Sequence, residues 1–214
     1  MQNKTEILIP ETSSHVYNRA NGSEKLFRSA ENYRYFLEKY HEYISPVADT
    51  FCYCLMPNHF HFLIRIKPET VLVEHFNSLQ RQSATLQVKT LEGLPKQEAI
   101  SKLLNQQFSN FFNGYTQAFN KQHMRKGSLF MHPFKRKKIS DRDYLFKLIH
   151  YIHYNPLEAN LCNHITDWPY SSYQEILSET SFFLKKEEVI DWFNNKENFI
   201  HFHSQQVEKE TTAQ

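Results

Sequence analysis

The feature that most constrains the fold is a pair of apolar runs separated by one sharp break. Residues 47–55 are rich in aromatic, aliphatic and cysteine side chains, and residues 59–66 (HFHFLIRI) follow them almost at once. The break between them is Met56-Pro57-Asn58, and proline followed by asparagine is typical of a tight turn. Runs of this length and composition predict strands. We therefore expect these two strands to pair as a hairpin.

Helices and shorter strands are predicted around this hairpin. We expect a strand at residues 14–19 and one or two short strands within 129–139, broken by Pro133. Helices are expected from the N-cap Ser29 to Ile44, stopped by Pro46, and at residues 71–79, 99–120, 141–154 (ended by Pro156) and 185–193. Residues 80–97 and 157–178 read as irregular, and residues 1–12 and 204–214 as frayed or disordered. This order predicts an α+β fold in which helices pack on an antiparallel sheet.

Composition excludes several classes of protein. The 214 residues are 40% hydrophobic and 22% charged, which is typical of a globular chain. The four glycines are too far apart to form the Gly-rich loops that hold nucleotide phosphates, so we expect no nucleotide cofactor. The sequence contains no apolar run of 18 residues, and its three cysteines suit free thiols in a reducing compartment. We therefore expect a cytoplasmic protein without a membrane span.

Positive charge is concentrated in one segment. The net charge is +2, but residues 121–147 contain nine Lys and Arg against two Asp, so this segment carries +7 and the rest of the chain −5. A local concentration of this kind indicates a binding site for a polyanion such as a nucleic acid. A solvated charged strand would account for the same composition.

The second strand of the predicted hairpin carries a histidine pair. Because side chains alternate along a strand, His59 and His61 project from one face and Phe60 from the other. Two imidazoles on one face can share a metal ion, or they can be hydrogen-bonded structural histidines. Residues 201–203 repeat the same His-Phe-His tripeptide in a polar C-terminal stretch. The tripeptide alone therefore does not identify a site.

A second candidate pair lies on the predicted helix 141–154 and at its end. Tyr151 and Asn155 are four residues apart and so share a face if the helix reaches that far. A tyrosine phenol can attack phosphorus, and an amide oxygen can bind a hard cation. Asn155 precedes Pro156, however, which disfavours a helical backbone at Asn155. Among the 12 tyrosines of the chain, any single one is more often an amphipathic core residue than a nucleophile.

Together, residues 56–63 (MPNHFHFL) and 151–156 (YIHYNP) resemble the motifs of single-tyrosine HUH transposases, in the branch of REP-associated tyrosine transposases. The resemblance runs from about residue 14 to 173 and includes VYNR at 16–19, GSLF at 127–130 and DWPYSSY at 167–173. It implies a ferredoxin-like (RRM-like) HUH endonuclease core. It also implies one domain at residues 1–178 with a polar insertion near 80–104. Residues 179–214 would form a helical extension and a disordered tail.

The resemblance also implies a function. The protein would be a transposase or strand transferase that cleaves and rejoins single-stranded, hairpin-containing DNA through a 5′-phosphotyrosine on Tyr151, acting as a monomer or homodimer. His59, His61 and Asn155 would bind Mg²⁺ or Mn²⁺. The expected contacts to the DNA backbone are Arg125, Lys135, Arg136, Lys137 and Lys138. Since alternate residues of a strand share a face, about half of the run at 135–138 should touch DNA.

Two other functions are compatible with the residues. A non-catalytic nucleic-acid-binding module of the same fold would keep the basic segment and would not need the histidines or Tyr151. A zinc hydrolase could use His59 and His61 with Cys52 or Cys54, although two buried thiols in a core strand are the better explanation of those cysteines. No H-E-x-x-H or C-x-x-C motif supports zinc.

Overall fold

The computed structural model describes residues 6–82 and 95–205, and its centre is a four-stranded sheet. The strands are β1 (Ser13–Arg19), β2 (Ala48–Met56), β3 (His59–Ile66) and β4 (Lys135–Lys138). Their order is β2-β3-β1-β4, with every pairing antiparallel. The hairpin predicted around residues 56–58 is therefore confirmed. The order of strands and helices along the chain is that of a ferredoxin-like fold, which confirms the predicted α+β class.

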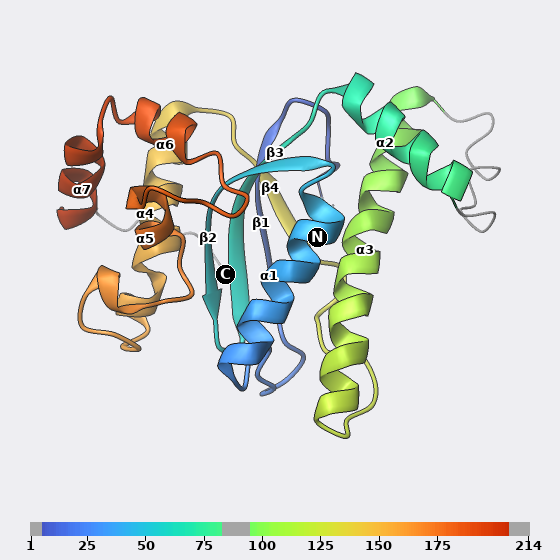
Figure 1. Cartoon of the computed structure of the whole chain (residues 1–214), viewed down its shortest axis with the longest axis horizontal. Helices are drawn as coiled ribbons and strands as arrows, with labels where there is room; N and C mark the ends of the chain where they lie inside the picture. The colour runs from blue at the N-terminus through green and yellow to red at the C-terminus, as the bar shows by residue number, and fades with distance from the viewer. Residues whose placement is uncertain (1–5, 83–94, 206–214) are drawn as a thin grey trace, which may run out of the picture.

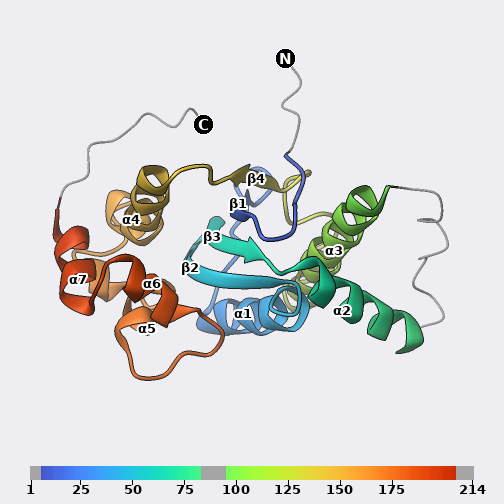
Figure 2. The ribbon, with the colours of Figure 1, turned by 90° about the horizontal axis from the view of Figure 1, so that it is seen from above.

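Helices lie on both sides of the sheet (Figures 1 and 2). Helices α1 (Ala30–Ile44) and α3 (Lys96–Gln122) pack together on one face, and α2 (Glu69–Gln82) contacts α3. Helix α4 (Arg142–Glu158) packs on β2 and β3 from the other face. The chain then continues through a 3₁₀ turn (Ile165–Asp167), α5 (Tyr173–Leu177), α6 (Lys186–Trp192) and α7 (Lys196–Ser204) on the side of α4.

An aromatic core fills the space between the sheet and α1 and α3. Phe62 of β3 stacks on Tyr40 of α1 with ring centroids 4.1 Å apart, and Phe60 contacts Phe36 at 5.3 Å. Both β3 phenylalanines are buried, which stabilises the sheet through apolar surface removed from water. The alternation along β3 then turns His59 and His61 toward α4, on the opposite face.

Helix α4 does not end where its proline predicted. It continues to Glu158 with Pro156 inside it, so the prediction that Pro156 ends this helix is wrong. Proline removes the one N–H that would have reached the carbonyl of Ile152, which is a limited loss so near the helix end. The N–H of Ala159 donates to the Asn155 carbonyl at 3.0 Å and closes the last turn. Asn155 therefore keeps a helical position one turn after Tyr151.

Other boundaries also differ from the prediction. The stretch 129–139 forms one strand, β4, and an isolated bridge between Ala20 and Phe130. The stretch 157–178, predicted as irregular, contains the 3₁₀ turn and α5, and the helix at 186–192 is followed by another, α7. Part of the predicted insertion near 80–104 is helical, because α2 extends to Gln82 and α3 begins at Lys96. The remainder of that insertion and the tail after residue 205 lie outside the described residues.

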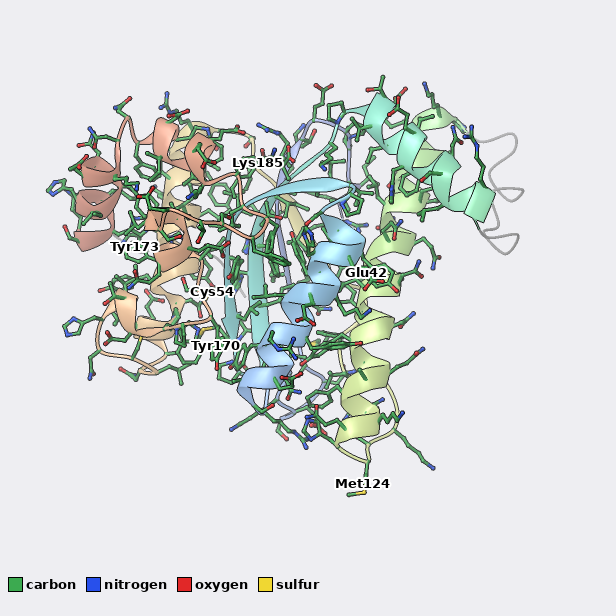
Figure 3. The ribbon with its side chains drawn as sticks, viewed as in Figure 1. Glu42, Cys54, Met124, Tyr170, Tyr173 and Lys185 are labelled. Atoms are coloured by element: carbon green, nitrogen blue, oxygen red, sulfur yellow. The ribbon has the colours of Figure 1, made fainter. Side chains whose placement is uncertain are left out.

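The segment after α4 covers the outer edge of β2. The N–H of Leu55 donates to the Tyr170 carbonyl at 2.9 Å, and the N–H of Lys185 donates to the Thr50 carbonyl at 2.9 Å. Tyr170 and Lys185 are both labelled beside this strand in Figure 3. The described part of the C-terminal extension thus packs against the sheet rather than standing apart from it. Within the described residues, no helix has the length and apolarity needed to cross a membrane.

Candidate active site

Four of the predicted site residues come together between β3 and α4. His59 Nε2 lies 3.3 Å from Asn155 Oδ1, and His61 Nε2 lies 3.5 Å from Asn155 Nδ2. The rings of His61 and Tyr151 meet edge to face with centroids 5.3 Å apart. Residues that are some 90 positions apart in the sequence therefore form one cluster, as the resemblance implied.

Helix α4 presents its two site residues at different depths. Its N-terminus is capped by Asp141, whose carboxylate accepts from the Tyr144 N–H at 2.7 Å. Tyr151 and Asn155, one turn apart, face the sheet; Tyr151 is 37% exposed, whereas Asn155 is 8% exposed. A large substrate can therefore reach the phenol, while the amide remains packed beside the histidines.

Each histidine is oriented by a hydrogen bond at its far nitrogen. His59 Nδ1 bonds to Asn58 Oδ1 at 2.7 Å, and His61 Nδ1 bonds to His15 Nε2 of β1 at 2.9 Å. When these Nδ1 atoms are the donors, both Nε2 atoms carry a lone pair toward Asn155. A partner of this kind on the second ring nitrogen is typical of histidines that bind metal ions.

The environment keeps these imidazoles neutral. Burial lowers the pKa of His61 well below its usual value, and the neighbouring His15 and His59 lower it further. Burial also lowers the pKa of His59, partly opposed by its contact with Asn155 and reinforced by Arg19. Neutral rings are the form that binds a cation.

Two of the three candidate ligands, His59 and Asn155, have a spacing that fits a divalent cation. With Asn58 accepting from His59 Nδ1, the lone pairs of His59 Nε2 and Asn155 Oδ1 point at each other, and a cation between them would satisfy both. Two ligands about 2.1 Å from one ion are about 3.0–3.4 Å apart, which matches their 3.3 Å separation. The described residues include no group of three or more His, Cys, Asp or Glu side chains that could hold a metal ion. The candidate set therefore depends on the Asn155 amide.

Tyr151 holds its proton in the free protein. Burial raises the pKa of its phenol above the usual value, whereas its side-chain hydrogen bond with Asn155 lowers it. The same amide thus contacts both the phenol and the histidines. A reaction at this hydroxyl would require the proton to leave as the new bond forms.

The site includes residues to which the sequence assigned no role. His15 stacks on Tyr17 with ring centroids 4.6 Å apart, and the Nζ of Lys137 lies 4.2 Å from the ring centroid of Tyr144. Tyr144 lies two turns before Tyr151 on α4, so both occupy the same side of that helix. The sequence could have indicated His15 and Tyr17, because they are two residues apart on one predicted strand and therefore share a face.

The basic strand β4 divides its side chains between two faces. Lys135 pairs with Tyr17 and Lys137 with His15, so these lysines lie on the face of the site. Arg136 pairs with Val16 and points the other way, where its guanidinium lies 4.7 Å from the Phe134 ring centroid and hydrogen-bonds to Asn105 on α3. Lys138 pairs with Ser14 and, two residues after Arg136, lies on the same face of the strand as Arg136.

Arg125 is placed differently from these lysines. Its guanidinium bonds to Glu24 at 3.2 Å, to Asn120 at 2.8 Å and to the Ser128 carbonyl at 2.8 Å, and its side chain is largely buried. These contacts hold the loop after α3. The predicted contact of Arg125 with DNA would have to compete with them.

The cysteines offer no metal site of their own. Cys52 and Cys54 are buried in β2, and burial raises the pKa of both thiols. The Cys54 thiol lies 3.8 Å from the Met56 sulfur. Protonated thiols in apolar surroundings are poor zinc ligands, so nothing in the described site favours the zinc hydrolase.

Comparison with known proteins gives a match at the level of structure. No family model and no curated protein sequence matches the chain. Among solved structures, a REP-associated tyrosine transposase bound to a REP hairpin superposes with a TM-score of 0.59, over 84% of this chain and 87% of that one. The chain has the fold of that transposase. Only 10% of the aligned residues are identical. The likeness to the REP-associated transposase therefore confirms the expected fold of the core, and any conclusion about chemistry has to come from the site residues themselves.

Proposed function

We propose that the protein is a strand transferase that cleaves and rejoins single-stranded DNA, with Tyr151 as the nucleophile. The observation that carries the proposal is the convergence of Tyr151, Asn155, His59 and His61 in one partly exposed cluster. The transposase fold adds support, because it unites the strand and the helix on which these residues lie.

A divalent cation belongs to this proposal. His59 and His61 would hold it through Nε2, and Asn155 through Oδ1. An amide ligand and a phosphate substrate favour Mg²⁺ or Mn²⁺ over zinc. When bound, such an ion would withdraw charge from the phosphate oxygens and favour ionisation of the nearby phenol.

The chemical step can be written with Tyr151. Its phenolic oxygen attacks the phosphorus, and the bond from phosphorus to the 3′ oxygen breaks as the phosphotyrosine bond forms. Overall, the phenol proton passes to the 3′ oxygen, which leaves as a free hydroxyl, while the protein keeps the 5′ end. The phosphodiester energy is retained in the covalent intermediate, so attack by a 3′ hydroxyl can reverse the step without a nucleotide cofactor.

The face around the cluster suits unpaired DNA. Lys135 and Lys137 provide positive charge for phosphates, and the rings of Tyr17 and Tyr144 lie beside them. The structural relative is described with a REP hairpin, which supports a substrate that combines a hairpin with a single-stranded flank.

The proposal can be tested by trapping the intermediate. The protein is incubated with 5′- and 3′-labelled hairpin DNA panels and Mn²⁺, and covalent adducts are separated on a denaturing gel. Wild-type protein should form an adduct that carries the 3′ label, because the phosphotyrosine joins the protein to the new 5′ end of the downstream fragment, and Tyr151→Phe should form none. Tyr154→Phe is the matched control, because Tyr154 stacks on His150 on another side of α4. An adduct with Tyr151→Phe would show that another residue attacks, and DNA binding without any adduct would favour the non-catalytic module.

A further inference from the structure

A buried chain of hydrogen bonds lies behind α4, outside the candidate active site. His203 Nε2 of α7 is 2.9 Å from His153 Nδ1 of α4, and His153 Nε2 is 2.8 Å from Ser172 Oγ. All three residues are buried, with exposures of 3%, 1% and 0%. Three polar side chains in an apolar interior are stable only when their hydrogen bonds are satisfied, so their geometry is tightly constrained.

The Phe199 carbonyl favours one direction for the protons in this chain. His203 Nδ1 is 2.8 Å from the carbonyl of Phe199, which can only accept, so His203 carries its proton on Nδ1. Its Nε2 then accepts from His153 Nδ1–H, and His153 Nε2 can accept from the Ser172 hydroxyl, which also lies 3.1 Å from the Tyr53 carbonyl. In this arrangement all three groups are hydrogen-bonded as neutral species.

Ser172 connects the chain to the sheet. The N–H of Tyr53 in β2 donates to Ser172 Oγ at 2.8 Å, and the N–H of Ser172 donates to the Tyr53 carbonyl at 3.0 Å. The next residue of β2, Cys54, pairs with His61 across the sheet. The chain therefore runs from α7 through α4 to the strand that adjoins the histidine pair.

His153 lies midway between the two site residues of α4. Tyr151 precedes it by two positions and Asn155 follows it by two, so it projects from the opposite side of the helix. Tyr173, labelled in Figure 3, packs against this back side, with its ring 5.7 Å from that of His153 and 5.2 Å from that of His203. The back of α4 is thus held by directional bonds, whereas its front faces the cluster.

We infer that His203 is a positioning residue for strand transfer: through His153 and Ser172 it holds α4 at the depth and rotation that bring Tyr151 and Asn155 to His59 and His61. This inference rests on the proposed function for its catalytic consequence. Its structural content, the placement of α4, stands on the hydrogen bonds alone.

The test compares two substitutions at one position. His203→Leu keeps the apolar volume but leaves His153 Nδ1–H without an acceptor. His203→Gln can accept from that N–H and donate to the Phe199 carbonyl. We expect His203→Leu to slow adduct formation about tenfold and to raise the Mn²⁺ concentration needed for half-maximal rate, with DNA affinity unchanged. His203→Gln should return both values to within about threefold of wild type.

Matched variants separate positioning from general loss of stability. His201→Leu changes an exposed residue of the same helix and should leave the rate and the Mn²⁺ dependence unchanged. Ser172→Ala interrupts the same chain at its other end by removing a single oxygen atom, and it should reproduce the Mn²⁺ effect even if His203→Leu does not fold. Equal losses in the Leu and Gln variants, or wild-type behaviour in both His203→Leu and Ser172→Ala, would overturn the inference.

A measurement that does not depend on catalysis distinguishes failure of the positioning inference from failure of the proposed function. The Tyr151 and His61 rings, 5.3 Å apart, should give a proton–proton cross-peak in NMR spectra of the full chain. We expect the peak to weaken in His203→Leu and Ser172→Ala and to persist in His201→Leu. If wild-type protein forms no adduct, the proposed function fails while this comparison still decides the positioning role. An unchanged peak in both chain variants would refute that role.

Discussion

The His-Phe-His tripeptide occurs twice in this molecule, once on a strand and once on a helix, and its histidines have different environments in the two copies. In His59-Phe60-His61 on β3, both histidines turn to α4 and the phenylalanine enters the aromatic core. In residues 201–203 on α7, His203 is buried and His201 is exposed. Side chains two apart point the same way on a strand but about 200° apart on a helix. The same three residues can therefore form a two-nitrogen site only where the backbone is extended.

The two copies also differ in what remains for a ligand. His203 uses both ring nitrogens within the protein, on the Phe199 carbonyl and on His153. His59 and His61 each use Nδ1 for support and direct Nε2 at the amide of Asn155. One copy uses its buried histidine for structure alone, and the other turns two ring nitrogens to the amide that the proposed function assigns to a cation.

The largest expected effect comes from removing one nitrogen of the β3 pair. His61→Ala should lower the rate of adduct formation at least about 1,000-fold, because loss of a metal ligand removes several kcal/mol of charge stabilisation. His201→Ala should stay within about twofold. Single-turnover cleavage assays on labelled DNA measure both. A His61→Ala enzyme with near wild-type rate would mean that the two tripeptides do not differ in function.

The next effect is a loss of stability in acid, to which His203 of the C-terminal copy contributes. Burial lowers the pKa of His203 to about 4, partly opposed by the Phe199 carbonyl. Its unfolded pKa is about 6.5, so the stability it contributes is complete above pH 6.5 and is lost as the pH falls toward 4. The contribution of His203 to the free energy of unfolding that is lost over this range is on the order of 3 kcal/mol. Urea unfolding at pH 7 and pH 5 should show a smaller drop for His203→Gln than for wild type or for the exposed control His201→Gln; equal drops in all three would contradict it.

A smaller effect is expected at the support of the β3 pair. His15→Phe keeps the ring stacked on Tyr17 but removes the partner of His61 Nδ1. Metal affinity should fall about 10- to 100-fold, as is usual when the outer partner of a histidine ligand is lost. Calorimetric titration with Mn²⁺ measures this. Unchanged affinity would show that His61 is oriented by packing alone.

The smallest effect tests strand alternation again, on β4. Lys137→Ala should weaken single-stranded DNA binding about three- to tenfold and reduce the slope of log affinity against log salt by about 1. Lys138→Ala, one position further on the strand, should change both values less. Fluorescence anisotropy at several salt concentrations provides the measurement. Equal losses from the two lysines would indicate that DNA wraps around this edge rather than lying on one face.

Local patterns predicted the sheet well and the cluster in part. The hairpin and the shared face of His59 and His61 follow from period-two alternation, which burial on one side of a sheet enforces. The proximity of Tyr151 to these histidines is a tertiary contact between distant segments, and it was expected from the family resemblance rather than from any local pattern.

Where local sequence patterns were wrong or incomplete, the common physical cause is a tertiary contact with a distant segment. Pro156 disfavours a helix locally, but packing of α4 against β2 and β3 outweighs the one hydrogen bond it removes. Residues 201–203 look polar in sequence, yet α7 buries His203 against α4, and the role of His203 became visible only with its partner His153 in place. The DNA contact predicted for Arg125 rests on its charge alone, because the sequence does not reveal that Glu24 faces it.

The two outer strands of the sheet are protected in different ways. Strand β4 is four residues long and entirely basic, so the same edge of a second copy would be repelled by its positive charge. Strand β2 is long and apolar, and its backbone groups at Thr50, Tyr53 and Leu55 are hydrogen-bonded to residues 170–172 and 185. A chain truncated before this segment would present β2 as a template for strand addition, and we would expect it to self-associate into β-rich aggregates even though every residue of the proposed catalytic cluster were still present.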